Sequence, residues 1–113
     1  MKILAFEKDV PGVEENRFSE LLLREEAARV WELYQSGRIR EMYFRADRDA
    51  AVLLLECENV EEARDLLDTL PLVRHRLIEF EVVLLRAYPG FARLFPTKVE
   101  SGALQPKSNP EGT

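Results

Sequence analysis

The chain has 113 residues, a formal net charge of −5 at pH 7, and 46% hydrophobic and 33% charged residues. This length suits a single domain with its own core, and one cysteine excludes an intramolecular disulfide or a four-cysteine metal site. The negative charge argues against nucleic-acid binding, which depends on lysine and arginine. No run approaches the roughly 20 apolar residues of a membrane helix, and residues 1–8 lack a signal-peptide pattern. We therefore expect a cytoplasmic protein.

Residues 2–8 predict a first strand, whose apolar residues on both faces indicate a central position in a sheet. A helix is predicted after Ser19, which can cap its N-terminus, and before Gly37, which can end it in a left-handed conformation. The apolar stripe of this helix is expected to pack in the core and consists of Leu23, Ala27, Val30, Trp31 and Tyr34.

Two extended runs follow, residues 38–47 and 50–57, joined by the polar turn Asp47-Arg48-Asp49. Such a pair is typical of a β-hairpin. Strict alternation along the first run predicts one mostly apolar face and one face that carries Ile39, Glu41, Tyr43 and Arg45.

A second helix is predicted after its cap Asn59, and Pro71 is expected to end it. Its apolar stripe consists of Val60, Ala63, Leu66, Leu67 and Leu70. Residues 77–86 predict the last strand, in which apolar residues alternate with Glu79 and Glu81. One further helical turn is expected over residues 91–95.

The order β-α-β-β-α-β predicts a ferredoxin-like α+β fold, with a four-stranded antiparallel sheet and both helices on one face. We expect this domain over residues 1–96 and a flexible tail over residues 97–113. Exposing an aliphatic side chain on the uncovered face costs on the order of 1.5–3 kcal/mol. The side chains concerned are Val52, Leu54, Val83 and Leu85. A homodimer or higher homo-oligomer that packs through this sheet face is therefore expected.

Several functions found on this fold lack their residues in this chain. The central run 51–56 has no aromatic residue for stacking RNA bases. The single Cys57 excludes a two-cluster ferredoxin and a Cys-x-x-Cys metallochaperone, and one histidine provides no metal or haem site. A glycine-rich phosphate loop is also missing. We therefore expect no cofactor and no metal, and we interpret Cys57 as a buried structural thiol.

The candidate catalytic residues are Glu41, Tyr43 and Arg45, at alternate positions of one strand. Arg45 can hold a substrate carboxylate and Glu41 can move a proton. Glu79 and Glu81 are further candidates for substrate binding. The alternative is that these charges form ion pairs across a dimer interface.

His75 is a fourth catalytic candidate, since histidine exchanges protons near neutral pH. It lies between Pro71 and Leu77, in a segment expected to connect the second helix to the last strand. The alternative for His75 is a solvated loop residue without a role in chemistry.

A set of residues and short motifs spread over roughly residues 20–90 carries a family resemblance: Gly37, Arg40, Asn59-Val-Glu61, Leu70-Pro-Leu72 and Ile78-Glu-Phe-Glu-Val82. In these the sequence resembles the muconolactone isomerase-like proteins of the dimeric α+β-barrel superfamily. The resemblance implies a dimer with paired sheets and a small-molecule pocket between sheet and helices or inside the barrel. It further implies a cofactor-independent isomerase or lyase that shifts a proton on a small carboxylated or lactone substrate, in which Tyr43 would donate to the developing enolate. The alternative is a non-catalytic small-molecule-binding or structural dimer.

Overall fold

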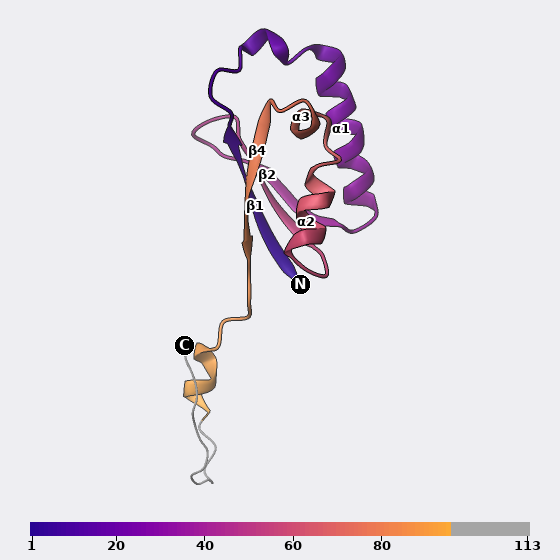
Figure 1. Ribbon diagram of the computed structural model, residues 1–113. Helices are drawn as coiled ribbons and strands as arrows, with labels where there is room; N and C mark the ends of the chain where they lie inside the picture. Colours follow the sequence, from indigo (N-terminus) through magenta and orange to yellow (C-terminus); the bar gives the residue numbers. More distant parts are fainter. Residues whose placement is uncertain (96–113) are drawn as a thin grey trace.

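The structure is a computed structural model that describes residues 1–95. Its strands form one antiparallel sheet in the order β2-β3-β1-β4. They are β1 Lys2–Asp9, β2 Ile39–Phe44, β3 Ala51–Glu56 and β4 Ile78–Leu84. The helices lie on one side of the sheet (Figure 1) and are α1 Glu20–Gln35, α2 Val60–Leu67 and α3 Pro71–Arg74. The predicted ferredoxin-like arrangement is confirmed, with α3 and the 3₁₀ turns η1 (Glu15–Arg17) and η2 (Gly90–Leu94) as additions.

Both predicted ends of α1 are confirmed. The Ser19 hydroxyl accepts a hydrogen bond from the Leu22 N–H at 3.2 Å, which satisfies a donor of the first turn. At the other end Gly37 has a φ of +83°, and the Arg38 N–H donates to the Leu33 carbonyl at 3.0 Å. This left-handed closure is the reason that a glycine stands there.

The main core lies between α2 and the sheet. The side chain of Asn59 accepts from the Glu62 N–H at 2.7 Å and so caps α2 as predicted. The apolar stripe of α2 is also confirmed. The buried side chains that meet here are Ile3, Ala5, Leu53 and Leu55 from the sheet, and Ala63, Leu66, Leu67 and Leu70 from α2 and the loop after it.

The expected burial of the α1 stripe is wrong for its large members. Leu23, Trp31 and Tyr34 are 44%, 58% and 47% exposed. Trp31 and Tyr34 stack on each other instead, with ring centroids 6.0 Å apart. The helix is rotated so that Leu23, Trp31 and Tyr34 lie beside its buried face and not within it. The more buried line of the helix consists of Leu22, Glu26, Val30 and Leu33.

A β-bulge in β2 corrects the predicted faces of the hairpin. Ile39 pairs with Leu55 and Glu41 pairs with Leu54, so Arg40 is an extra residue in the ladder. Because one inserted residue reverses the alternation, buried Ile39 faces the helices and not the side of Glu41. Beyond the bulge the alternation is as predicted.

Pro71 does not end α2, which stops earlier, at Leu67. It begins α3 as the first helical residue, where the missing N–H of proline costs nothing. The end of α3 resembles a glycine closure, but the left-handed residue is Arg76, with a φ of 59°. The Leu77 N–H then donates to the Leu72 carbonyl at 2.9 Å. Part of the predicted connector is therefore helical.

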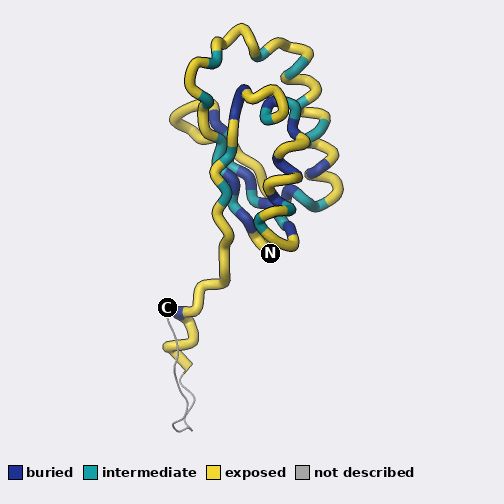
Figure 2. The backbone as a smooth tube through the Cα atoms, viewed as in Figure 1, coloured by how far each residue is buried: buried dark blue, intermediate teal, exposed yellow. Residues whose placement is uncertain are grey.

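After β4 the chain leaves the body of the domain as an arm, residues 85–95 (Figures 1 and 2). The helical turn expected there corresponds to η2. The rings of Tyr88 and Phe91 meet edge to face, 5.1 Å apart. Tyr88 also covers Gly90 so closely that a Cβ at this position would overlap the ring. The arm thus has local order although most of it is exposed.

The domain limit at residue 96 stays a prediction. Residues 97–113, expected to form a flexible tail, lie outside the described residues. Among residues 1–95, no helix combines the length and the apolar character that crossing a membrane requires.

Leu55 and Leu54 provide a matched test of the two sheet faces. Leu55 is fully buried among the core side chains, so Leu55→Ala should lower the free energy of unfolding by about 2–5 kcal/mol. Leu54→Ala removes the same atoms from the uncovered face and should cost clearly less in a monomeric chain. Urea unfolding followed by circular dichroism measures both. A loss below roughly 1 kcal/mol for Leu55→Ala would contradict the core position.

Candidate functional site

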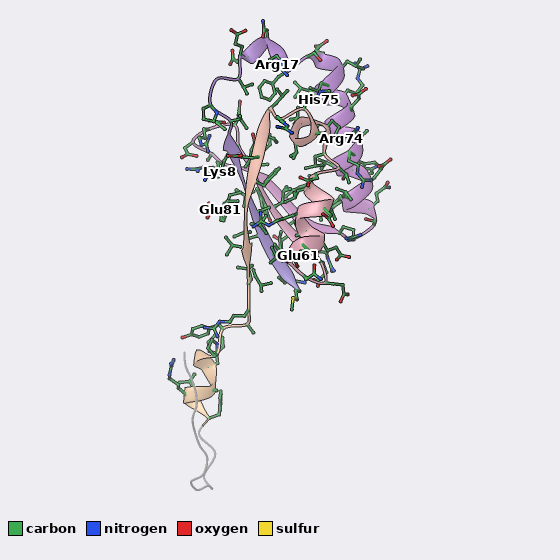
Figure 3. The ribbon with its side chains drawn as sticks, viewed as in Figure 1. Lys8, Arg17, Glu61, Arg74, His75 and Glu81 are labelled. Atoms are coloured by element: carbon green, nitrogen blue, oxygen red, sulfur yellow. The ribbon has the colours of Figure 1, made fainter. Side chains whose placement is uncertain are left out.

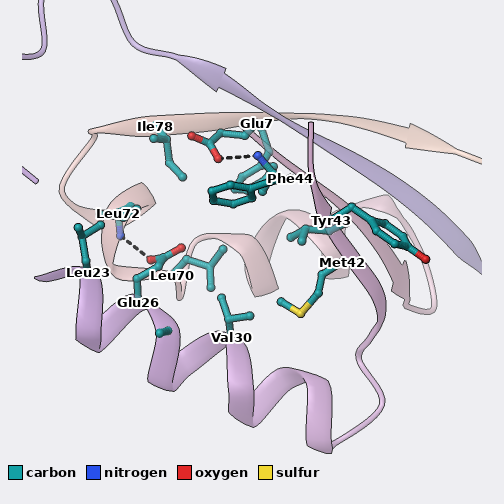
Figure 4. Close-up of a pocket in the computed structure, with 14 residues that line it drawn as sticks. Glu7, Leu23, Glu26, Val30, Met42, Tyr43, Phe44, Leu70, Leu72 and Ile78 are labelled. Carbon is teal, nitrogen blue, oxygen red and sulfur yellow. Dashed lines mark hydrogen bonds between the residues drawn. The ribbon is translucent and has the colours of Figure 1, made fainter. Parts of the chain in front are cut away.

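A pocket of about 380 Å³ opens between α1 and the helix-facing side of the sheet (Figure 4). Most of its wall is apolar. The apolar lining residues are Leu23, Ala27 and Val30 from α1, Met42, Phe44, Ala51, Leu53, Ile78 and Phe80 from the strands, and Leu70 and Leu72 around α3. The wall also contains Tyr43 and two carboxyl groups, those of Glu7 and Glu26.

The pocket exists because the two long helices cover the sheet unequally. Helix α2 buries three side chains against the sheet, whereas α1 buries only Leu33. The α1 residue at the middle of the gap is Ala27, whose short side chain leaves the space unfilled. Three of the five residues in the stripe predicted for the core, Leu23, Ala27 and Val30, therefore line a pocket.

Glu7 enters the pocket from β1, where it shares the helix-facing side with Ala5. The pairing of β1 with β3 stops at Phe6 and Val52. The next backbone N–H of β3, that of Ala51, donates instead to Glu7 Oε1 at 2.8 Å. Burial raises the pKa of Glu7, and the hydrogen bond from Ala51 opposes this effect without cancelling it.

Glu26 enters the pocket from α1. Its Oε1 accepts a hydrogen bond from the Leu72 N–H at 2.9 Å. Leu72 lies in the first turn of α3, where the helix itself offers no acceptor for backbone N–H groups. Burial raises the pKa of Glu26, the bond from Leu72 lowers it, and the negative charge of Glu7 raises it further.

The two carboxyl groups face the same apolar space (Figure 4). In each, one oxygen is held by a backbone N–H, and within residues 1–95 no hydrogen bond reaches the other oxygen. A carboxyl group with a raised pKa gives and takes protons closer to neutral pH. The arrangement can therefore perform general acid–base chemistry.

The residues expected to be catalytic lie on the uncovered face and in the hairpin turn. The Tyr43 hydroxyl donates to Glu41 Oε1 at 2.9 Å, and this bond raises the pKa of Tyr43. Arg45 is turned away from both and donates twice to Asp47, at 2.9 and 2.7 Å. All of these side chains are exposed. Although Tyr43 borders the pocket, its hydroxyl points away from it (Figure 4).

The other three candidates, His75, Glu79 and Glu81, lie away from the pocket. His75 is exposed at the C-terminal end of α3, and Glu81 projects from β4 on the side opposite the helices (Figure 3). Glu79 shares that side and pairs with Lys8 of β1 in the sheet register. None of the three lines the pocket. The roles in catalysis and substrate binding stay predictions for Glu41, Tyr43, Arg45, His75, Glu79 and Glu81.

Glu7 and Glu26 were not among the sequence-based candidates, although the sequence contains a signal for both. Glu7 follows Ala5 at the spacing of a strand face that is otherwise apolar. Glu26 lies four residues after Leu22 and four before Val30, on one face of a helix. In both elements an acidic residue occupies an apolar position of the pattern.

Cys57 is buried as predicted, and burial raises the pKa of its thiol. Over the described part of the chain, the side chains of His, Cys, Asp and Glu form no cluster of three or more that could hold a metal ion. The pocket beside α1 is a concave site that holds two carboxyl groups.

Comparison with known proteins concerns the fold. The chain is similar to muconolactone isomerase, with a TM-score of 0.66 and 22% identity, over 79% of this chain and 92% of the other. It is also similar to a 5-chloro-2-hydroxyhydroquinone dehydrochlorinase of Burkholderia phenoliruptrix, solved with 2,5-dihydroxybenzoquinone; the TM-score is 0.54 and the identity 19%, over 80% and 98% of the two chains. The sequence matches no protein-family model and no curated protein. The predicted muconolactone isomerase-like fold is confirmed.

Glu26 predicts a dependence of stability on pH. Its pKa is higher in the folded chain than the ordinary value of 4.5, so the folded state holds the proton more tightly than the unfolded state. Stability contributed by this group is complete below that value and is lost as the pH rises through the folded pKa. Glu26→Gln removes the charge but keeps an acceptor for the Leu72 N–H. It should raise the thermal midpoint at neutral pH, by roughly 4–8 °C per kcal/mol recovered.

The gain from Glu26→Gln should disappear below pH 4.5. Scanning calorimetry over a pH series measures it, and Glu25→Gln, an exposed neighbour on α1, is the matched control. The same gain at every pH would show that the charge of Glu26 is not its cause.

Proposed function

We propose that this chain, which has a muconolactone isomerase-like fold, binds a small carbonyl compound in the pocket beside α1 and shifts a proton on it without a cofactor. The reaction class is isomerisation or elimination, in which a proton leaves a carbon atom next to the carbonyl group. One observation carries the proposal. Two half-buried carboxyl groups, those of Glu7 and Glu26, face one apolar pocket, and both have raised pKa values.

Glu26 is assigned the protonated form at the start of the reaction, and Glu7 the ionised form. Burial and the charge of Glu7 raise the pKa of Glu26, whereas Glu7 has both acidic neighbours, Asp9 and Asp49, that raise its pKa and a basic one, Arg48, that lowers it. Ionised Glu7 then removes the proton next to the carbonyl group, while the O–H of Glu26 donates a hydrogen bond to the developing enolate oxygen and keeps its proton. Glu26 next protonates a more distant carbon. The proton has then moved from Glu26 to Glu7, and exchange with water resets the pair.

The setting suits this chemistry in size and polarity. The pocket volume of about 380 Å³ is within the range of about 300–1,000 Å³ that small-molecule sites occupy. The mostly apolar wall lowers the local polarity, which strengthens the electrostatic effect of the two carboxyl groups on a bound carbonyl. General acid–base catalysis of this kind contributes about 10²–10⁴-fold to a rate.

We also propose a homodimer in the cytoplasm, packed through the uncovered sheet face. The central positions of this face carry large apolar side chains that the helices do not cover: Leu4, Phe6, Val52, Leu54, Val83 and Leu85. Pairing two such faces would remove this apolar area from water. Glu41, Tyr43, Arg45, Glu79 and Glu81 would then lie at the interface. Charge pairing between subunits is the non-catalytic alternative for them.

The catalytic proposal predicts that Glu7→Gln and Glu26→Gln each lower turnover by roughly 10²-fold or more. A panel of unsaturated lactones and hydroxylated quinones in deuterated water, followed by NMR, measures proton shift and exchange directly. Glu25→Gln is the matched control, since Glu25 is exposed one residue away on α1. Thermal unfolding of each variant separates lost chemistry from lost folding.

Glu41→Gln in the same assay tests the competing site on the sheet face. A large loss for Glu41→Gln, with full turnover in Glu7→Gln and Glu26→Gln, would move the chemistry to Glu41, Tyr43 and Arg45. Unchanged turnover in all three variants would remove both sites from the mechanism.

The dimer predicts that Leu54→Arg yields a monomer, because a buried charge without a partner is costly at an apolar interface. Analytical ultracentrifugation at micromolar concentration measures the mass. Leu21→Arg on α1, where Leu21 is 63% exposed, is the control and should leave the mass unchanged. A wild-type chain that sediments as a stable monomer would disprove the dimer.

A further inference from the structure

The charges around the pocket point to the kind of ligand it accepts. We propose that the pocket selects flat, uncharged molecules that can both donate and accept a hydrogen bond, and that it rejects carboxylates. This inference rests on the proposed function for the location of the site, and it narrows the ligand from carbonyl compounds in general to neutral ones. It concerns binding and is tested apart from turnover.

No Lys, Arg or His is among the residues that line the pocket in the described part of the chain. The arginines near its carboxyl groups are engaged elsewhere. Arg48 forms an ion pair with Asp9 at 3.2 Å. Arg29 donates to the Thr69 hydroxyl at 2.9 Å and to Glu32 at 3.0 Å. The phenol of Tyr43 donates to Glu41 and points out of the pocket. A bound anion would find no cation in this wall.

A bound anion would also meet like charge. Burial raises the pKa of Glu26, and the negative charge of Glu7 adds to this effect. A third negative charge in the same apolar space would have to be desolvated without a partner, which is the most costly form of burial for a polar group. A carboxylate ligand is therefore disfavoured by the same two residues that are proposed to do the chemistry.

A neutral ligand brings no charge that must be desolvated, and the two carboxyl groups do not repel it. A carboxylic acid donates its O–H to a ligand carbonyl, and a carboxylate accepts from a ligand hydroxyl or amide. Both partners are present when Glu26 is protonated and Glu7 is ionised. The remaining contacts would be made by Phe44, Phe80 and aliphatic side chains, which favour the flat face of a ring.

Two probes of nearly the same shape separate charge from size, namely 4-hydroxybenzamide, which is neutral, and 4-hydroxybenzoate, which is an anion near neutral pH. Each is titrated into the full chain, and NMR follows the backbone amides of Ala51 and Leu72. These two N–H groups donate to Glu7 and Glu26, so their signals report on this pocket and not on the surface. We expect the amide to shift both signals and to bind at least about tenfold more tightly than the acid.

The double variant Glu7→Gln/Glu26→Gln supplies the charge control. It removes both negative charges while keeping acceptors for Ala51 and Leu72, so the preference for the amide should fall to about threefold or less. Equal or tighter binding of 4-hydroxybenzoate to the wild-type chain would overturn the proposal. Binding of neither probe at millimolar concentration would overturn it as well. A preference that the double variant retains would show that shape and not charge selects the ligand.

These outcomes are distinct from those of the turnover assay. If the amide is preferred but no compound exchanges a proton, the ligand class stands and the catalytic role of Glu7 and Glu26 falls. If turnover is found only with carboxylated substrates, the ligand class falls and the catalytic role stands.

Discussion

Ile3 and Leu55 face each other across β1 and β3, the two central strands, and both are fully buried in one cluster with Leu67 and Leu70. This contact fixes α2 and the chain after it onto one half of the sheet. Helix α1 is joined to the sheet mainly through Leu33 and remains at a distance over the other half. The pocket is thus the space left by one tightly packed helix and one loosely packed helix.

The features that sequence reasoning predicted correctly depend on neighbours in the chain. The caps at Ser19 and Asn59 are formed by contacts within three residues, so the pattern alone reveals them. The alternation in β2 failed at Arg40, because nothing local marks the extra residue in the ladder. Helix α3 was missed because it ends in left-handed Arg76, where a glycine would have revealed the closure.

The pocket depends on distant contacts, which explains why its acids were missed. Glu7 and Glu26 accept from backbone groups 44 and 46 residues away. The candidates on the hairpin, in contrast, have hydrogen-bond partners that are close in the sequence. Glu41 and Tyr43 do meet, but Arg45 finds an acidic partner two residues along the chain, at Asp47. Ordering two side chains that are close in sequence costs less conformational entropy than ordering two on different strands. Arg45 therefore pairs with Asp47 and not with an acidic residue of another strand.

The bulge at Arg40 lies on β2, which is an edge strand of the sheet. Edge strands present unpaired N–H and C=O groups, on which another chain can add a strand and start an aggregate. An extra residue breaks the regular spacing of these groups and twists the edge, and the charge of arginine adds to the barrier. Only the short stretch from Glu41 to Phe44 keeps a regular ladder. The edge beside the pocket is thereby a poor template for uncontrolled strand addition, even though exposed aromatic side chains lie along it.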